Sequence, residues 1–254
     1  MMASDVFFYP SGGDEAFYGN LEKLADRWPH CIRHYMDLFP VYASRRAFIR
    51  HLAHYELFKL TADLPGHYAD FGVYYGKSFF SWHKFLEVFT PTATHKKVIG
   101  FDTFSGFPHL APQDGRADAS VQKHEGGLSS GVFLDEFEAI LDLHNADSVI
   151  PANRGIIIQG DVCTTLPAWL HQNPEARFCL LNLDVDLYEP TKVILEECWD
   201  RVVPGGVIIL DEYATSSWPG ETIAWDEFAR SRRIPACLKR FPFANAPGAY
   251  LIKP

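Results

Sequence analysis

The chain has 254 residues, of which 47% are hydrophobic and 22% charged, as in an ordinary globular protein. This length suits one large α/β domain or two small ones. The 23 basic and 32 acidic residues leave a formal net charge of −9, which argues against a general nucleic-acid binder because such proteins need a basic face.

The apolar runs are too short to span a membrane, and the first residues lack the basic-then-apolar pattern of a signal peptide. The five cysteines are scattered without a C-x-x-C pair, and most have apolar neighbours in the sequence. We therefore expect a cytoplasmic protein with reduced cysteines, and neither a membrane nor a nucleic acid as its partner.

Apolar residues at roughly helical intervals predict helix over residues 14–63, with Pro40 as a helix-breaking residue inside it. After Leu64-Pro65-Gly66, short apolar runs alternate with helical patterns, and a polar stretch with Gly and Pro runs from 105 to about 131. We expect strands at 68–71, 97–101, 155–159, 177–183 and 206–210, and helices at 77–89, 132–145, 164–173, 190–202 and 221–232.

This alternation predicts an α/β fold in which helices cover both faces of a mostly parallel sheet. Two more strands are expected at 236–241 and 248–252. Their connection is too short for a parallel crossover, so this last pair should be antiparallel. We expect a helical N-terminal extension or lid over residues 1–63 and one main domain over residues 64–254.

In such sheets ligands bind beyond the carboxyl ends of the strands. The turn Gly72–Ser78 follows the first strand, its glycines allow a ligand close to the backbone, and the next helix offers free N–H groups. The turn lacks both the G-x-G-x-x-G pattern and the G-x-x-x-x-G-K-[ST] phosphate loop. A glycine-rich turn without a ligand is the alternative.

Two further aspartates follow strands at the same edge. Asp102 ends the second strand about 30 residues after the glycine turn, where an acidic residue commonly accepts both hydroxyls of a ribose. Asp161, after Gly160, could accept from an adenine amino group or cap the next helix. A turn or cap role is the alternative for Asp102 as well.

Two acidic clusters end the next two strands, Asp184-Val185-Asp186 and Asp211-Glu212. Residues i and i+2 of a strand share a face, so Asp184 and Asp186 should point the same way. If the strands are neighbours about 5 Å apart, four carboxylates converge at one edge of the sheet. Such crowding is costly without a cation or proton, and oxygen-only ligands suit Mg²⁺. Turn and cap roles are the alternative for each single residue.

Two other segments each allow two interpretations. The segment Trp218–Thr222 reads as a lid near the acidic clusters or as a plain helix start. His124, in the polar stretch, reads as a substrate contact or as a solvated loop residue.

Four segments together resemble the macrocin O-methyltransferase family, and in particular its deoxysugar branch (dTDP-6-deoxy-L-hexose 3-O-methyltransferase-like). They are Gly72–Ser78, Phe101–Pro108, Leu183–Thr191 and Pro204–Tyr213, and the likeness covers residues from roughly 45 to 252. It implies the class I S-adenosylmethionine-dependent methyltransferase fold, with a seven-stranded, Rossmann-like sheet whose last strand is antiparallel, and a homo-oligomer acting on a small sugar substrate.

The resemblance also implies site roles. Asp186 matches the general base, and Asp184 a ligand of a divalent cation such as Mg²⁺. Asp211 and Glu212 match a ligand pair that is usually Asp-Asp, and the extra methylene of Glu212 would shift the metal or leave it to Asp211 alone. We expect S-adenosylmethionine to be bound by Gly72, Tyr74, Gly76, Ser78, Asp102, Thr103, Gly160, Asp161 and Asp184.

Methyl transfer fits this residue set. The reaction needs oxygen, methyl carbon and sulfur in line, and a sugar hydroxyl becomes a good nucleophile when a cation lowers its pKa and Asp186 takes its proton. The rivals are a metal-dependent hydrolase or hydroxylase-like enzyme on a similar sheet and a ligand-binding relative without chemistry. The sugar, its hydroxyl and whether it is nucleotide-linked stay open.

Overall fold

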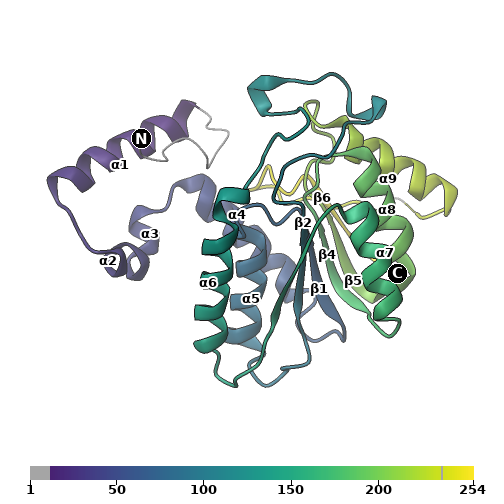
Figure 1. The fold of residues 1–254 in the computed structure, drawn as a ribbon, viewed down its shortest axis with the longest axis horizontal. Coiled ribbons are helices and arrows are strands. Elements are labelled where there is room, and N and C mark those ends of the chain that lie inside the picture. The colour runs from purple at the N-terminus through teal and green to yellow at the C-terminus, as the bar shows by residue number, and fades with distance from the viewer. Residues whose placement is uncertain (1–11, 236) are drawn as a thin grey trace. The chain divides into compact units, whose positions relative to one another are not determined.

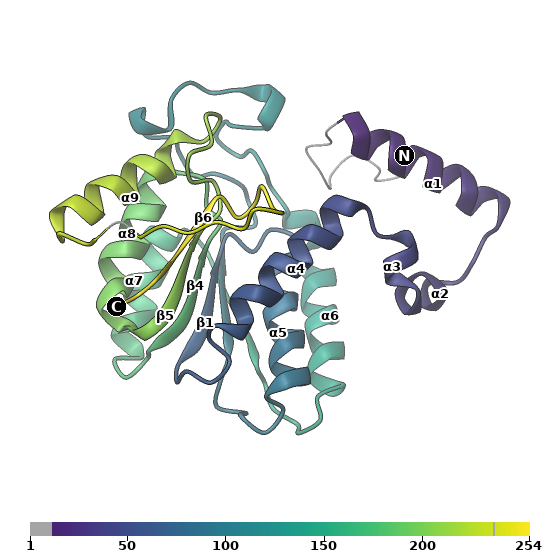
Figure 2. The same ribbon diagram turned by 180° about the vertical axis from the view of Figure 1, so that it is seen from behind.

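Within the described residues, six strands form one sheet in the order β3-β2-β1-β4-β5-β6. Figures 1 and 2 show the sheet from two sides. The structure is a computed structural model that describes residues 12–235 and 237–254. The first five strands are parallel, and β6 is antiparallel to β5. The strands are β1 (His67–Phe71), β2 (Val98–Asp102), β3 (Gly155–Gln159), β4 (Phe178–Leu183), β5 (Val202–Leu210) and β6 (Ala249–Ile252).

Helices cover both faces of the sheet, as the near-continuous apolar strands require. One core cluster includes Phe79 of α5 and Phe137 of α6, and the other includes Leu166 of α7, Ile194 of α8 and Trp225 of α9. Figure 1 shows these two groups of helices on opposite sides of the sheet. The helices are α5 (Lys77–Phe89), α6 (Leu134–Ala146), α7 (Val162–Gln172), α8 (Tyr188–Cys198) and α9 (Pro219–Ser231), with 3₁₀ helices at Pro112–Asp114, Ala119–Val121, Gly131–Phe133 and Trp199–Arg201.

The chain divides into two compact units, Met1–Leu52 and Ala53–Pro254. The stretch expected to be helical, residues 14–63, consists of four helices: α1 (Gly12–Arg27), α2 (Ile32–Asp37), α3 (Phe39–Tyr42) and α4 (Arg45–Lys59). Pro40 lies in the first turn of α3, where a missing N–H does no harm. A lid role for residues 1–63 stays a prediction. No helix of the described chain has the length and apolar character needed to cross a membrane.

The expected strand at 236–241 is wrong for the residues that the structure describes there, so the sheet has six strands and not seven. Ala236 lies outside the described residues, and from this segment only Lys239 pairs, in an isolated antiparallel bridge to Tyr250 with two bonds of 2.8 Å. Pro242 has no N–H to continue a ladder. The expected antiparallel pairing at the C-terminus is nevertheless confirmed by β6.

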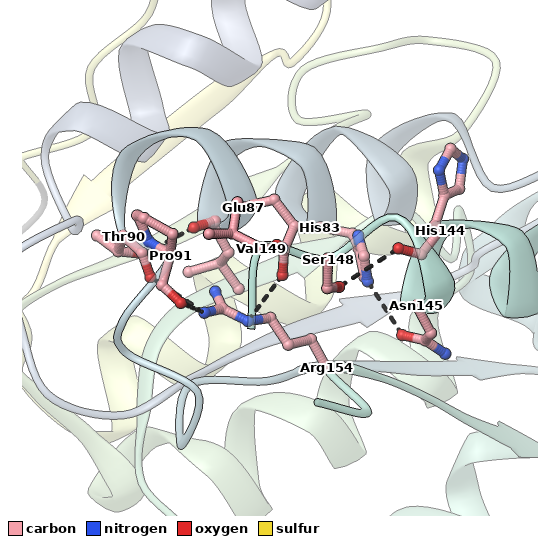
Figure 3. Close-up of polar contacts among 10 residues, drawn as sticks. His83, Glu87, Thr90, Pro91, His144, Asn145, Ser148, Val149 and Arg154 are labelled. Atoms are coloured by element: carbon pink, nitrogen blue, oxygen red, sulfur yellow. Dashed lines mark hydrogen bonds and ion pairs between the residues drawn. The ribbon is translucent and has the colours of Figure 1, made fainter. Parts of the chain in front are cut away.

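A buried ion pair ties α5 to the start of β3, away from the carboxyl edge of the sheet. Arg154 is fully buried, and its Nε lies 2.8 Å from Oε1 of Glu87 (Figure 3). Its Nη2 also donates to the carbonyls of Thr90 and Pro91, at 3.1 and 2.5 Å. The guanidinium therefore binds two carbonyls just beyond the C-terminal end of α5.

Candidate active site

A pocket opens at the carboxyl ends of β1, β2, β3 and β4. Loops that follow these strands line it, together with part of the polar segment 105–131, which Figure 1 draws in teal above the sheet. The residues that line it are Gly72, Tyr74, Phe101, Asp102, Thr103, Gly106, Phe107, Pro108, His109, Gly127, Leu128, Gly160, Asp161, Val162, Cys163, Asp184, Val185, Asp186, Leu187 and Pro190.

The structure brings most of the predicted site residues to this pocket. The proposed base Asp186 is there, with Gly72, Tyr74, Asp102, Thr103, Gly160, Asp161 and Asp184. Gly76, Ser78, Asp211 and Glu212 are not among its lining residues.

Gly72 sits where the turn after β1 meets the loop after β4. Its φ is +83°, and a Cβ added there would collide with the carbonyl oxygen of Asp184. Its N–H donates to the carbonyl of Phe101 at 3.0 Å. The glycine therefore serves a close approach between three neighbouring strand ends, where there is no room for a side chain.

Asp102 links the ends of β1 and β2. Its carboxylate accepts hydrogen bonds from the backbone N–H groups of Tyr74, at 2.7 Å, and Phe104, at 2.6 Å. Burial raises the pKa of Asp102, and these backbone donors oppose that shift. Asp102 also lines the pocket, so ribose contacts by this carboxylate stay a prediction.

Asp161 begins helix α7 as its N-cap. Its Oδ1 accepts from the N–H of Cys163 at 2.9 Å, so the capping role is confirmed. Because Asp161 also lines the pocket, contact with an adenine amino group stays a prediction. Thr103 shapes the next turn, since its hydroxyl donates to the carbonyl of Gly106 at 2.7 Å.

Ser78 points into the protein. Its hydroxyl donates at 2.8 Å to Asp70, a fully buried carboxylate in β1 that also accepts from Nδ2 of Asn182 in β4 at 2.7 Å. The role of Asp70 was missed from the sequence, although a carboxylate inside an otherwise apolar strand was a signal. This buried network joins β1, α5 and β4 beneath the glycine turn.

The two acidic clusters follow neighbouring strands, which meets the condition for their convergence. β4 and β5 are parallel with Leu183 opposite Leu210, and the N–H of Asp211 donates to the carbonyl of Leu183 at 3.1 Å. The reasoning that placed Asp184 and Asp186 on one strand face is wrong, because β4 ends at Leu183. Asp186 instead has a φ of +62° in the loop and is 8% exposed.

A fifth carboxylate belongs to this acidic region. Glu221, in the first turn of α9, is fully buried, and its Oε1 accepts from the N–H of Glu212 at 2.9 Å. Burial raises the pKa of Glu221, and the charges of four carboxylates raise it further: Asp211, Asp186, Glu212 and Asp184. From the sequence, Glu221 read as an ordinary acidic residue at a helix start, and its burial became evident only in the folded chain.

The acidic region fits a hard cation by the chemistry of its donors, since Asp184, Asp211 and Glu212 offer only oxygen. Among residues 12–235 and 237–254, however, no group of three or more His, Cys, Asp or Glu residues is arranged to hold a metal ion. The charges of the predicted metal ligands thus all act on Glu221, but these side chains are not arranged as a complete coordination site.

The segment Trp218–Thr222 is a helix start that also holds the second acidic loop. The hydroxyl of Thr222 accepts from the N–H of Ala214 at 2.8 Å, beside the bond between Glu221 and Glu212. The ring of Trp218 lies 5.5 Å from that of Phe107, which lines the pocket. His124 is exposed and is not among the residues that line the pocket.

The sequence model of the macrocin-O-methyltransferase (TylF) family matches residues 46–245. The chain belongs to this family. The resemblance inferred from the four segments is therefore confirmed. The match includes every residue of the pocket and of both acidic loops.

Two curated relatives are O-methyltransferases by name, and the name of the first includes a rhamnosyl group. The 8-demethyl-8-(2,3-dimethoxy-alpha-L-rhamnosyl)-tetracenomycin-C 4'-O-methyltransferase of Streptomyces olivaceus is 28% identical over 61% of this chain and 56% of its own length. The mycinamicin III 3''-O-methyltransferase of Micromonospora griseorubida is 25% identical over 61% of this chain and 58% of its own length. The chain thus matches little more than half the length of either relative.

Solved structures support the fold. The crystal structure of CalS11, a calicheamicin methyltransferase, superposes with a TM-score of 0.87 at 28% identity, over 99% of this chain and 98% of that one. The apo structure of CalS11, described as a TDP-rhamnose 3'-O-methyltransferase, gives 0.78 at 28% identity over 97% of both chains. The O-methyltransferase NovP, at 20% identity and 0.60 over 81% and 79% of the two chains, supports the fold alone. The macrocin-O-methyltransferase family member described here has the class I methyltransferase fold.

Proposed function

We propose that the chain is an S-adenosylmethionine-dependent O-methyltransferase that acts on a hydroxyl of a deoxysugar in natural-product biosynthesis. The observation that carries the proposal is one pocket lined both by the glycine turn with Asp102 and Asp161 and by Asp186. The first group suits a nucleoside cofactor, and the last suits a base. Family membership and the printed names of the relatives support methyl transfer to a sugar.

S-adenosylmethionine, when bound, supplies an electrophilic methyl group on a sulfonium sulfur. The residues around Gly72 and Asp102 hold the cofactor and orient it. Asp186 accepts the proton of the acceptor hydroxyl while the new oxygen–carbon bond forms and the sulfur–carbon bond breaks. Its place in the pocket wall at 8% exposure keeps this carboxylate near the acceptor and largely out of bulk water.

A requirement for a divalent cation is the finer part of the proposal. Asp184 and Asp211 would hold the cation, with Glu212 beside them, and the cation would lower the pKa of a neighbouring hydroxyl and offset the crowded charge. Two observations support this requirement. The three side chains offer only oxygen donors, and their negative charges together raise the pKa of the buried Glu221. Incubation with EDTA should abolish turnover and added Mg²⁺ should restore it, whereas full activity in excess chelator would exclude the requirement.

The acceptor is a rhamnose-like deoxysugar, either linked to a nucleotide or already attached to an aglycone. The names of the rhamnosyl and TDP-rhamnose methyltransferases support this class. Methyl-transfer assays over a panel of dTDP-deoxysugars and rhamnosylated aglycones test it. Transfer to a deoxysugar hydroxyl is the expected result, and hydrolysis of panel members without methyl transfer would favour the hydrolase alternative.

We also keep two of the expectations drawn from the sequence as proposals, a cytoplasmic location and a homo-oligomer. Cell fractionation checks the first, and light scattering on the purified protein checks the second.

A further inference from the structure

The polar segment 105–131, here called the wall segment, forms one side of the pocket without regular strands or long helices. Gly106, Phe107, Pro108, His109, Gly127 and Leu128 come from it. Its two ends are joined by backbone bonds between Phe107 and Gly127, at 3.1 Å, and between Gly126 and Phe107, at 2.9 Å. These bonds lie within the segment, so contacts with other parts of the chain are needed to fix its position over the pocket.

Asp114 is the first anchor. It lies in the wall segment, is 1% exposed, and its Oδ2 accepts from the N–H of Ala111 at 2.7 Å. Its Oδ1 accepts from the N–H of Tyr188 at 2.7 Å. Tyr188 is the first residue of α8 and lies two residues after Asp186, so a carboxylate of the wall segment fixes the point where the loop carrying the base enters its helix.

Lys123 is the second anchor. It is 5% exposed, and its Nζ donates to the carbonyl of Asp114 at 3.0 Å and to that of Ser217 at 2.8 Å. The ammonium also lies 5.5 Å from the centre of the Trp218 ring. Ser217 leads into α9, whose Glu221 holds the backbone of Glu212, so the second anchor reaches the other acidic loop.

Gly220 shows how closely these parts meet. A Cβ added there would collide with Oδ1 of Asp114 and lie 2.6 Å from the nitrogen of Tyr188. The first turn of α9, the first turn of α8 and the wall segment therefore contact one another at a point that has no room for a side chain.

We propose that Asp114 and Lys123 are positioning residues, which lock the wall segment, the Asp186 loop and the Glu212 loop into one arrangement. Neither side chain is among those that line the pocket, so both act through the groups they hold. The kinetic consequence rests on the proposed function. If the wall segment and Asp186 are displaced, kcat/KM for the acceptor should fall.

Asp114→Asn is the main test. An amide can accept from only one of the two N–H groups and turns its own N–H₂ toward the other. Asp118→Asn is the matched control, because Asp118 is an exposed carboxylate of the same segment that bonds to the N–H and hydroxyl of its neighbour Ser120. Lys123→Met is the second variant, which keeps an aliphatic chain against Trp218 and loses both carbonyl bonds.

Hydrogen exchange followed by mass spectrometry tests the lock without reference to catalysis. We expect at least tenfold faster exchange over residues 184–189 and 211–222 in Asp114→Asn or Lys123→Met, and no change there in Asp118→Asn. Exchange that accelerates only within residues 105–131 would overturn the proposal. A variant that cannot be purified leaves the other anchor to decide, because each is predicted to loosen both loops.

Kinetics provide the second readout. With an active wild type, Asp114→Asn should lower kcat/KM for the acceptor at least tenfold and leave the affinity for S-adenosylmethionine within about twofold, while Asp118→Asn matches the wild type. Equal kinetics of the two variants would overturn the positioning role. A wild type without methyl transfer would refute the proposed function alone, since the exchange result stands by itself.

Discussion

The buried side chain of Glu221 accepts a hydrogen bond of 2.9 Å from the backbone N–H of Glu212. Glu221 belongs to the first turn of α9, whereas Glu212 follows β5, so this bond joins a helix start to one of the two acidic loops. Glu212 stands where the resembled pattern usually has aspartate. The backbone of Glu212 is held by Glu221, which does not belong to the expected ligand pair Asp211 and Glu212. Glu221 therefore helps to fix the position of the second acidic loop.

Glu221→Ala should therefore destabilise the protein. The variant removes the acceptor of the half-buried Glu212 N–H, and the lost hydrogen bond costs about 1 kcal/mol. Urea unfolding monitored by circular dichroism measures the change. Glu221→Gln keeps an acceptor oxygen and serves as the control, so equal destabilisation by Gln and Ala would contradict a role for this hydrogen bond.

Asp186→Asn should separate the base from the cofactor site. The amide keeps the shape of the side chain but cannot take a proton, so kcat should fall by about 10²-fold or more. Affinity for S-adenosylmethionine, measured by calorimetry, should change little. Asp184→Asn should instead weaken metal binding. A near wild-type rate for Asp186→Asn would assign the proton to another acceptor, and loss of metal binding in that variant would make Asp186 a ligand.

Asp102→Ala should weaken the binding of S-adenosylmethionine by about 1–3 kcal/mol, the scale of a lost hydrogen bond to a charged group. Calorimetry on the purified protein measures this. Ser78→Ala is an informative comparison, because the Ser78 hydroxyl is bonded to the buried Asp70. We expect its effect on cofactor affinity to be the smaller one. Binding of NAD in place of S-adenosylmethionine would contradict the cofactor assignment.

Acidification should destabilise the fold partly through His144. Burial lowers the pKa of His144 from 6.5 to about 4, and the charges of Lys84 and His83 act in the same direction. The unfolded chain then binds the proton more readily, so this stability is present above pH 6.5 and is lost as the pH falls toward 4.

Thermal unfolding at pH 7 and pH 5 checks the histidine prediction. The midpoint should fall at pH 5, and the fall should be smaller in His144→Gln. Burial also lowers the pKa of His83 and His67, so part of the pH dependence should persist. An unchanged pH dependence in His144→Gln would exclude its contribution.

Local pattern in the sequence was enough for most of the fold. Helix α5 and strand β3 have the expected bounds, Lys77–Phe89 and Gly155–Gln159. Both could be predicted because the apolar residues that each element packs against the core are close together in the sequence. The location of the pocket could also be predicted, because the carboxyl ends of parallel strands lie at the same edge of the sheet. The strand expected near 239 failed because pairing depends on a partner edge and on the proline at 242, and hydrophobic content alone does not report these.

The sequence by itself determined which residues reach the carboxyl edge of the sheet: the glycine turn, Asp102, Asp161 and the two acidic clusters. Only the tertiary structure decided which of them face the pocket, because a side chain's partner can lie far along the chain. Asp70 meets Asn182 across 112 positions, and Asp114 meets Tyr188 across 74. Burial also depends on every element that packs nearby, so Glu221 and Lys123, polar residues in ordinary surface patterns, became buried anchors only once α8, α9 and the wall segment had come together.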